Sequence, residues 1–193
     1  NVTNKHLPVK CNRKKRNMHK VSAVSKKNVK GRSIEERAKT ILDRADYGHW
    51  EMDTVVGGQG GNKDCLLVLT ERKTRFEYIF KIPDKTQISV VKTLDRLEQL
   101  YGADNFRKTF KTITMDNGME FLDIQGVERS VIAPDIKRTV AYYCHPYCSF
   151  ERGSNENQNK MIRRHIPKGA DIGKYSQEEV SRIQDWMNDY PRA

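Results

Sequence analysis

The 193-residue sequence lacks several features that would place it in other classes of protein. It has no apolar run near the ~20 residues that a membrane-spanning helix needs, and no secretory signal pattern at its start. We therefore expect a cytoplasmic protein with no membrane partner. Its four cysteines are too few for a disulfide framework in a chain of this length. Cys144 and Cys148 are spaced like one half of a zinc site, but the other ligands of a structural zinc centre are missing.

Acidic residues are absent from the first 32 positions, which carry eleven lysines and arginines. The other 25 basic residues are balanced by 25 acidic ones in residues 33–193, so this arm holds the whole net charge of +11. Such segments are often disordered and attracted to polyanions. We predict that residues 1–32 form a flexible basic arm that binds DNA, with Lys14, Lys15 and Arg16 as candidate contacts. Binding of this kind weakens as salt rises; the alternative is a solvated linker with no specific target.

The remaining residues, 33–193, are enough for one domain with a hydrophobic core. Three strand-like segments come first: HWEMDTVV alternates, CLLVLTE is a short apolar run and RFEYIFKI alternates again. The intervening GGQGGNKD resembles a phosphate loop, but Asn62 precedes its lysine and a strand follows where such a loop needs a helix. We interpret it as a hairpin tip, and the three strands as an antiparallel meander.

Helical and strand patterns alternate in the rest of the domain. The predicted helices cover 86–101, a short part of 122–137, 154–165, and a last segment after a capping box at Ser176. The predicted strands are FKTITM and RTVAYYC, while SIEERAKTILDRADYG before the meander is a short helix or an extended lead-in. The last helix is expected to bury the face that comprises Val180, Ile183, Met187 and Tyr190. This order predicts an α/β domain in which helices pack on a mixed sheet.

Two aspartates stand out because of where their strands place them. Asp53 lies within the first strand, on the same face as Glu51, and Asp116 ends the fourth, directly before the turn-forming Asn117-Gly118. If the chain returns the fourth strand beside the first, the two aspartates meet without a basic partner and must share a cation or a proton. The alternatives are a plain turn at Asp116 and an ion pair between Asp53 and one of the many lysines or arginines.

The stretches HWEMD, TMDNGMEF and RGSNENQNK, in this order, resemble the integrase-core DDE transposases. The segments from Gly48 to Asp53 and from Arg152 to Asn159 are most similar to the IS-thirty family of bacterial insertion-sequence transposases, and the resemblance extends from Gly31 to the last residue. It implies a ribonuclease-H-like fold of the retroviral-integrase kind, with a five-stranded mixed sheet (β-β-β-α-β-α-β-α) and helices on both faces. It also implies a bacterial, nucleoid-associated protein.

The resemblance implies a set of catalytic and metal-binding residues, namely Asp53, Asp116 and Glu156. Glu156 fits the third position because it follows Gly153 at the start of a helix. Glu151 precedes the glycine, in a mobile active-site loop, and is expected to be solvated. The 39 residues between Asp116 and Glu156 are more than is usual in the family, and we expect the extra ones in the loop 122–137.

The resemblance also implies a reaction and its partners. Carboxylates suit Mg²⁺ or Mn²⁺, and two ions are expected when DNA is bound, where they clamp an in-line displacement at phosphorus. Water cleaves at the transposon end, and the freed 3′-hydroxyl then joins target DNA. Since transposition joins two ends, we expect a homodimer or a larger assembly. The expected DNA contacts at the site are Asn159, Lys160, Arg163 and Arg152; the alternative for Lys160 is a plain surface pair with Glu156.

Two other functions are compatible with the same fold. A ribonuclease-H-like nuclease would only hydrolyse its substrate, and a non-catalytic transposase-derived DNA-binding protein would have lost the triad, which is intact here. Because the chain begins with Asn1 and shows no helix-turn-helix pattern, we expect a core fragment or a processed form. It would then lack the DNA-end-binding part and the extreme C-terminus.

Overall fold

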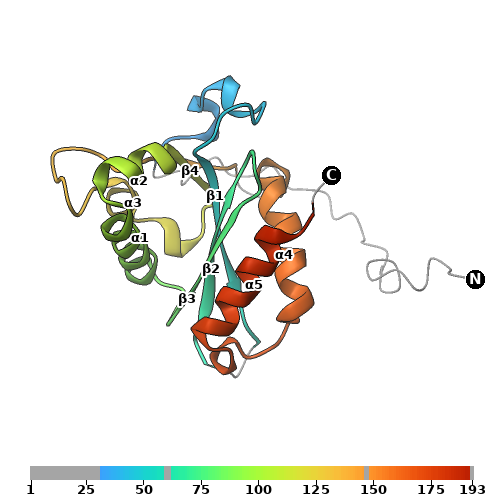
Figure 1. Cartoon of the computed structure of the whole chain (residues 1–193). Coiled ribbons are helices and arrows are strands. Elements are labelled where there is room, and N and C mark those ends of the chain that lie inside the picture. Colours follow the sequence, from blue (N-terminus) through green and yellow to red (C-terminus); the bar gives the residue numbers. More distant parts are fainter. Residues whose placement is uncertain (1–30, 59–61, 146–147, 192–193) are drawn as a thin grey trace, which may run out of the picture.

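The fold is built on a five-stranded sheet with the strand order β3-β2-β1-β4-β5 (Figure 1). The structure, a computed structural model, describes residues 31–58, 62–145 and 148–191, without the side chains of Ser149, Phe150 and Glu156. The strands are β1 (His49–Val56), β2 (Cys65–Glu71), β3 (Glu77–Ile82), β4 (Thr112–Met115) and β5 (Val140–Tyr143). Strands β1 to β3 are antiparallel, whereas β4 is parallel to both β1 and β5. The predicted mixed sheet is therefore confirmed.

The hairpin between β1 and β2 confirms the interpretation of the glycine-rich stretch. Val56 pairs with Cys65 at the open end of the predicted turn, and the register continues to Trp50 opposite Glu71. Residues 59–61 at the tip lie outside the described residues. Strand β2 is buried along its whole length, which explains why its sequence is a continuous apolar run and not an alternating one.

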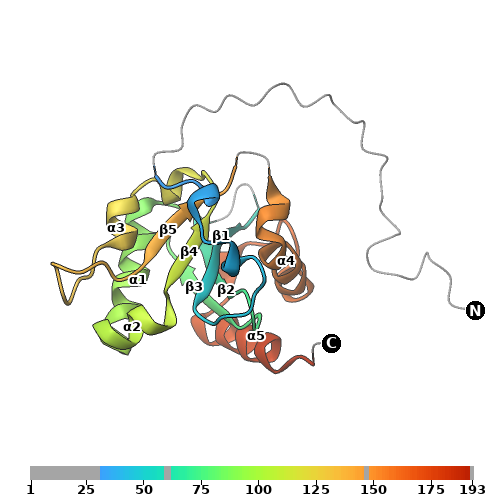
Figure 2. The same cartoon turned by 90° about the horizontal axis from the view of Figure 1, so that it is seen from above.

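In the described part of the chain, five α-helices cover the two faces of the sheet. They are α1 (Gln87–Tyr101), α2 (Ala103–Thr109), α3 (Ile124–Glu128), α4 (Gly153–His165) and α5 (Gln177–Asp189). Figures 1 and 2 show α1, α2 and α3 on one face and α4 and α5 on the other. The predicted helices are all present, and α2 is one that the sequence analysis missed.

The boundaries of α1 have simple local causes. The hydroxyl of Thr86 accepts a hydrogen bond from the backbone N–H of Ser89 at 3.3 Å, which caps the first turn. Gly102 then adopts φ +75°, a conformation that favours glycine, and ends the helix. The chain resumes a helical path at once in α2, whose Phe106 is fully buried. The stop at Gly102 is thus a bend between two helices.

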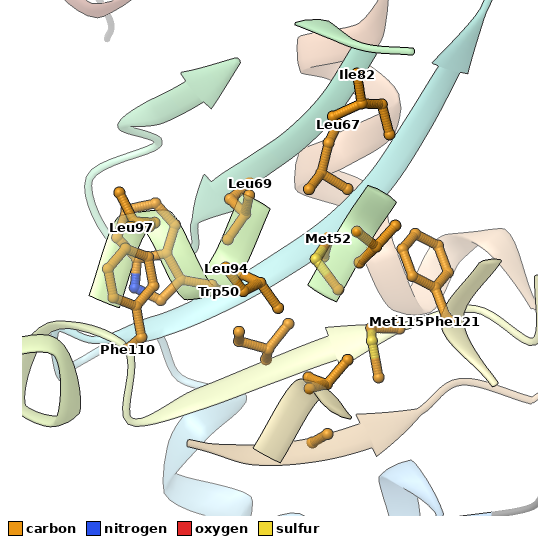
Figure 3. Close-up of a cluster of buried hydrophobic side chains, with 14 of the residues drawn as sticks. Trp50, Met52, Leu67, Leu69, Ile82, Leu94, Leu97, Phe110, Met115 and Phe121 are labelled. Atoms are coloured by element: carbon orange, nitrogen blue, oxygen red, sulfur yellow. The ribbon is translucent and has the colours of Figure 1, made fainter. Parts of the chain in front are cut away.

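Each face of the sheet has its own hydrophobic core. The core beneath α1 and α2 joins Trp50 and Met52 of β1 to Leu94 and Phe110 (Figure 3). The core beneath α4 and α5 contains Val55 of β1 with Ile162, Ile166 and Val180. Strand β1 supplies both cores because successive side chains point to opposite faces. Within the described residues, no helix is long and apolar enough to cross a membrane.

At the ends of the domain, the buried face expected of the last helix was wrong at one position, and the lead-in has the short helical form that was one of its two expected forms. Tyr190 is 41% exposed and follows the end of α5, so it does not extend the buried face of Val180, Ile183 and Met187. The lead-in forms two 3-10 turns, at Ile34–Glu36 and Lys39–Ile41. It also covers the edge of β5, because Ser33 bridges to Tyr143, whose N–H donates to the carbonyl of Arg32 at 2.8 Å.

The other edge of the sheet is covered by α5, which binds the backbone of β3 through three amide side chains. Each accepts a hydrogen bond from a β3 N–H that no neighbouring strand uses. The pairs are Glu77 to Asn188 Oδ1 at 2.8 Å, Ile79 to Gln184 Oε1 at 2.8 Å, and Lys81 to Gln177 Oε1 at 3.2 Å. The three bonds are possible because alternate residues of a strand point their N–H groups to the same edge, and Gln177, Gln184 and Asn188 lie along the side of α5 that faces this edge.

The core beneath α1 gives a direct stability prediction. Leu94→Ala should lower the free energy of unfolding by about 3 kcal/mol, because it leaves a cavity at a fully buried position. Leu100→Ala is the control on the same helix, where the side chain is 82% exposed, and should change stability by less than about 0.5 kcal/mol. Urea unfolding of both variants measures the difference, and equal losses would contradict the described packing.

Candidate active site

Asp53 and Asp116 lie together at the centre of the sheet. Strand β1 pairs in parallel with β4, with Glu51 opposite Thr114. Extending this register by two residues places Asp53 of β1 level with Asp116, which directly follows β4. The prediction that the first and fourth strands are neighbours is therefore confirmed, and it is this pairing that brings the two carboxylates to one place.

The sequence analysis expected the two aspartates to meet without a basic partner, and this expectation was wrong. Arg152 lies between them: its Nη2 donates to Asp116 Oδ2 at 3.0 Å, and its Nη1 lies 3.4 Å from Asp53 Oδ1. Nη1 also donates to the backbone carbonyl of Met52 at 3.3 Å. Two like charges this close require a compensating cation, and in this structure the guanidinium supplies it.

The remaining carboxylate oxygens are held by polar groups of the same site. Asp53 accepts hydrogen bonds from the N–H of Thr54 at 2.8 Å and from Asn159 Nδ2 at 2.9 Å. Asp116 Oδ1 accepts from the N–H of Gly118 at 2.9 Å. The Asp116 side chain is 40% exposed and that of Asp53 is 20% exposed, so the pair is oriented by the protein yet open to solvent.

The charges of the site shift each other's ionisation. Burial raises the pKa of Asp53 and the Asp116 carboxylate adds to the rise, while Arg152 opposes it. For Arg152, burial alone would lower the pKa, but the two carboxylates outweigh it and the pKa is raised. The guanidinium therefore stays charged, and it offsets part of the cost that burial imposes on the charged carboxylate of Asp53.

Glu51 anchors the helix that borders the site. It is fully buried, forms an ion pair with Arg72, and its Oε2 accepts a hydrogen bond from the N–H of Asn155 at 3.1 Å. A carboxylate at the amino end of a helix is favoured by the helix dipole. The strand that carries Asp53 thus also fixes the start of α4.

The structure places the other predicted site residues along α4. Glu156 lies in its first turn, with a side chain outside the described part. Asn159 binds Asp53, as described above. Lys160 is exposed, and its Nζ lies 3.4 Å from Asn157 Oδ1. Arg163 is turned toward backbone carbonyls, with Nη2 donating to Val56 at 2.8 Å. Lys14, Lys15 and Arg16 lie outside the described residues.

Glu151 is not the solvated loop residue that the sequence analysis expected. Its side chain is only 14% exposed. It accepts hydrogen bonds from the backbone N–H of His145 at 2.8 Å and lies 2.7 Å from the Nδ1 of the same residue. The Nε2 of His145 lies 3.2 Å from Glu35 in the lead-in. The hydrogen bond between His145 and the carboxylate of Glu151 raises the pKa of His145, and the nearby carboxylate of Glu35 adds to the rise.

A second buried glutamate supports the turn after Asp116. Glu120 accepts a hydrogen bond from the hydroxyl of Thr54 at 2.7 Å and pairs with Lys85 at 3.1 Å. A Cβ added at Gly118 would lie 2.6 Å from Glu120 and 2.9 Å from the Asp116 carboxylate, so a larger residue here would displace the carboxylate ends of these two side chains. Sequence reasoning missed Glu120, although a glutamate beside the apolar Phe121 could have indicated a buried carboxylate with a partner.

The donor set fits a hard divalent cation, although the third expected ligand is not described. Asp53 and Asp116 direct oxygens at one shared cation, which here is the guanidinium of Arg152, and carboxylate oxygens are the ligands that Mg²⁺ and Mn²⁺ prefer. Among the described side chains, no group of three or more His, Cys, Asp or Glu residues could hold a metal ion.

Comparison with solved structures identifies the fold. The catalytic core domain of BIV integrase matches with a TM-score of 0.54 and 17% sequence identity, over 77% of this chain and 88% of that chain. The chain therefore has the ribonuclease-H-like fold of an integrase catalytic core, as predicted.

Sequence comparison finds relatives with higher sequence identity than this solved structure. The chain is 34% identical over 162 residues to a probable transposase for the insertion-like sequence element IS1161 of Streptococcus salivarius, which covers 84% of this chain and 43% of that protein. It is 32% identical to the transposase for IS4351 of Bacteroides fragilis, over 82% of this chain and 45% of that protein. It is 31% identical to the transposase InsI for IS30C of Escherichia coli, over 85% of this chain and 39% of that protein.

The chain is thus similar in sequence to transposases of insertion sequences, and it has the fold of an integrase catalytic core. It spans less than half the length of the curated relatives that it matches. No protein-family model matches the sequence.

The anchoring role of Glu51 predicts a large loss of stability on its removal. Glu51→Gln leaves the buried Arg72 without its counter-charge and should lower the free energy of unfolding by about 3 kcal/mol. Hydrogen exchange at the Asn155 amide should accelerate in the same variant. Asp185→Asn, at an exposed position of α5, is the control and should change stability by less than about 0.5 kcal/mol. A Glu51 variant as stable as this control would show that the ion pair does not anchor α4.

The pairing of His145 predicts a pH dependence. Because its pKa is raised in the folded protein, the protonated ring contributes stability that is fully present below the unfolded pKa of about 6.5. That contribution is lost as the pH rises through the higher folded pKa. Urea unfolding of wild type and His145→Ala at several pH values should give a difference that shrinks with rising pH. A difference that grows over this range would contradict the contact with Glu151.

Proposed function

We propose that this chain is the catalytic core of a transposase that cleaves DNA at transposon ends and joins the resulting 3′-hydroxyl to target DNA. The observation that carries the proposal is the pair of aspartates held level on neighbouring parallel strands of an integrase-like sheet. The guanidinium of Arg152 lies between their carboxylates. Its relatives are described as transposases of insertion sequences, which supports DNA as the substrate.

Asp53, Asp116 and Glu156 are the proposed metal ligands, and Mg²⁺ or Mn²⁺ the proposed ions. Residues three or four apart share one face of a helix. Position 156 therefore lies on the same face of α4 as Asn159, which binds Asp53, and near Arg152, which binds both aspartates. Glu151, in contrast, is occupied by His145. These contacts favour Glu156 as the third ligand.

The residues of the chain would orient the reacting groups and balance their charges. Divalent ions, when bound, would activate the attacking oxygen and stabilise the leaving one. The N–H groups of Thr54 and Gly118 fix the rotation of the two aspartates, and this preorganisation reduces the cost of binding a cation between them. Tyrosine, serine and cysteine nucleophiles have no role in this proposal, because the hydroxyl of water or DNA attacks directly.

DNA would approach along the open side of the aspartate pair. Lys160 is exposed on α4 one turn beyond Glu156, and Asn159 and Arg163 follow the same side of the helix. We propose these three residues, with Arg152 and the basic arm at Lys14, Lys15 and Arg16, as contacts with phosphates. A complex that joins two transposon ends requires at least two copies of the protein, which we propose to assemble in the bacterial cytoplasm on nucleoid DNA.

Substitution of the two neighbouring glutamates tests the proposal. In the full-length protein, Glu156→Gln and Asp53→Asn should each lower Mg²⁺-dependent joining of a pre-cut DNA end at least about 100-fold, because each removes a charge that stabilises the transition state. Glu151→Gln is the matched control and should retain most of the joining activity.

The outcome separates the possible functions of the fold. Loss of joining in Glu151→Gln together with normal joining in Glu156→Gln would reverse the assignment of the third ligand. A wild-type protein that nicks DNA in an Asp53-dependent manner but never joins a pre-cut end is a nuclease that only hydrolyses. A protein that binds DNA but neither cuts nor joins it is a DNA-binding relative of transposases.

A further inference from the structure

The contact of Arg152 with both aspartates carries a consequence for metal entry. We propose that Arg152 is a built-in cation that occupies the metal-free site, and that it must withdraw before a divalent ion binds to Asp53 and Asp116. This inference rests on the proposed function, since it concerns the same carboxylate pair. It assigns to Arg152 a role that precedes any contact with DNA.

Arg152 and a divalent ion would compete for the same carboxylate oxygens. The guanidinium binds Oδ2 of Asp116 and lies next to Oδ1 of Asp53, so it fills the space between the two carboxylates. An ion shared by these carboxylates needs that space and those lone pairs. A guanidinium and a divalent ion are both positive, and they cannot stand side by side there without strong repulsion.

Few contacts other than those with the two aspartates hold Arg152 in place. Its remaining hydrogen bond, to the carbonyl of Met52, is long at 3.3 Å. Its Nε is buried and has no hydrogen-bond partner. The side chain is 12% exposed, so it is held within the site chiefly by the charges of the two aspartates. Neutralising those charges with a metal ion removes the main attraction that retains it.

The backbone at Arg152 can accommodate the withdrawal of this side chain from the two aspartates. Arg152 ends a 3-10 turn (Ser149–Arg152) and stands directly before α4, whose start has no side-chain cap. A Cβ added at the next residue, Gly153, would meet nothing within 4 Å. From Asn155 onward, α4 is held by the contact of Asn155 with Glu51 and by the packing of Ile162 in the core. Withdrawal of Arg152 therefore leaves the helix that carries Glu156 in place.

Direct measurement of metal binding without DNA tests the inference. Mn²⁺ titrated into the full-length protein, followed by electron paramagnetic resonance of the free ion, should bind Arg152→Gln about tenfold more tightly than wild type. The gain arises because wild type spends most of its time in the arginine-occupied state, which reduces its apparent affinity by that fraction. Arg164→Gln removes an equal charge from an exposed position of α4 and should leave the affinity within about twofold of wild type.

The competing outcomes are distinguishable. If Mn²⁺ binding is abolished by Asp53→Asn but is not tightened by Arg152→Gln, the metal site stands and the role of Arg152 is refuted. If Asp53→Asn has no effect on Mn²⁺ binding, the proposed metal site itself fails. Should Arg152→Gln not fold, Arg152→Met decides the question, because methionine removes the charge and keeps a long unbranched side chain for packing. Tighter Mn²⁺ binding in that variant supports the inference, and equal or weaker binding overturns it.

Discussion

The parallel pairing of β1 with β4 is the constraint on which the rest of the site depends. It brings the strand-borne Asp53 level with Asp116, although 62 residues separate them in the sequence. The same strand anchors α4, because buried Glu51 binds the N–H of Asn155. A single central strand therefore positions one aspartate, aligns the second and fixes the helix that carries Glu156. Any change that shifts the register of β1 by one residue would move all three relationships together, since it turns each side chain to the opposite face.

Two arginines of the domain each meet two carboxylates, but in different surroundings. Arg138 is fully buried and pairs with Asp95 at 2.6 Å and with Glu98 at 3.4 Å. At the candidate site, the guanidinium of Arg152 compensates two carboxylates that are 20% and 40% exposed, and burial together with the neighbouring charge raises the pKa of Asp53. Conflicts of this kind between local stability and global fold are typical of functional sites.

The sequence predicted the parts of the molecule whose signals are local. The strand at HWEMDTVV, the end of the first long helix before Gly102 and the capping box at Ser176 all follow from neighbouring residues, and the structure has each of them. The partners of buried charges were not predictable in this way. Arg152 meets Asp53 across 99 positions, and Glu51 meets Asn155 across 104, so only the folded chain determines these pairs. Helix α2 was missed because Gly102 was interpreted as a stop, whereas it joins two helices.

The amide side chains that α5 places along β3 have a consequence for association between molecules. An outer strand usually exposes a row of unpaired backbone donors, which invites strands from other chains to extend the sheet. Here Gln177, Gln184 and Asn188 already accept three of those donors. Extending the sheet at this edge would first require α5 to detach. The helix thereby protects this edge of the sheet against edge-to-edge association.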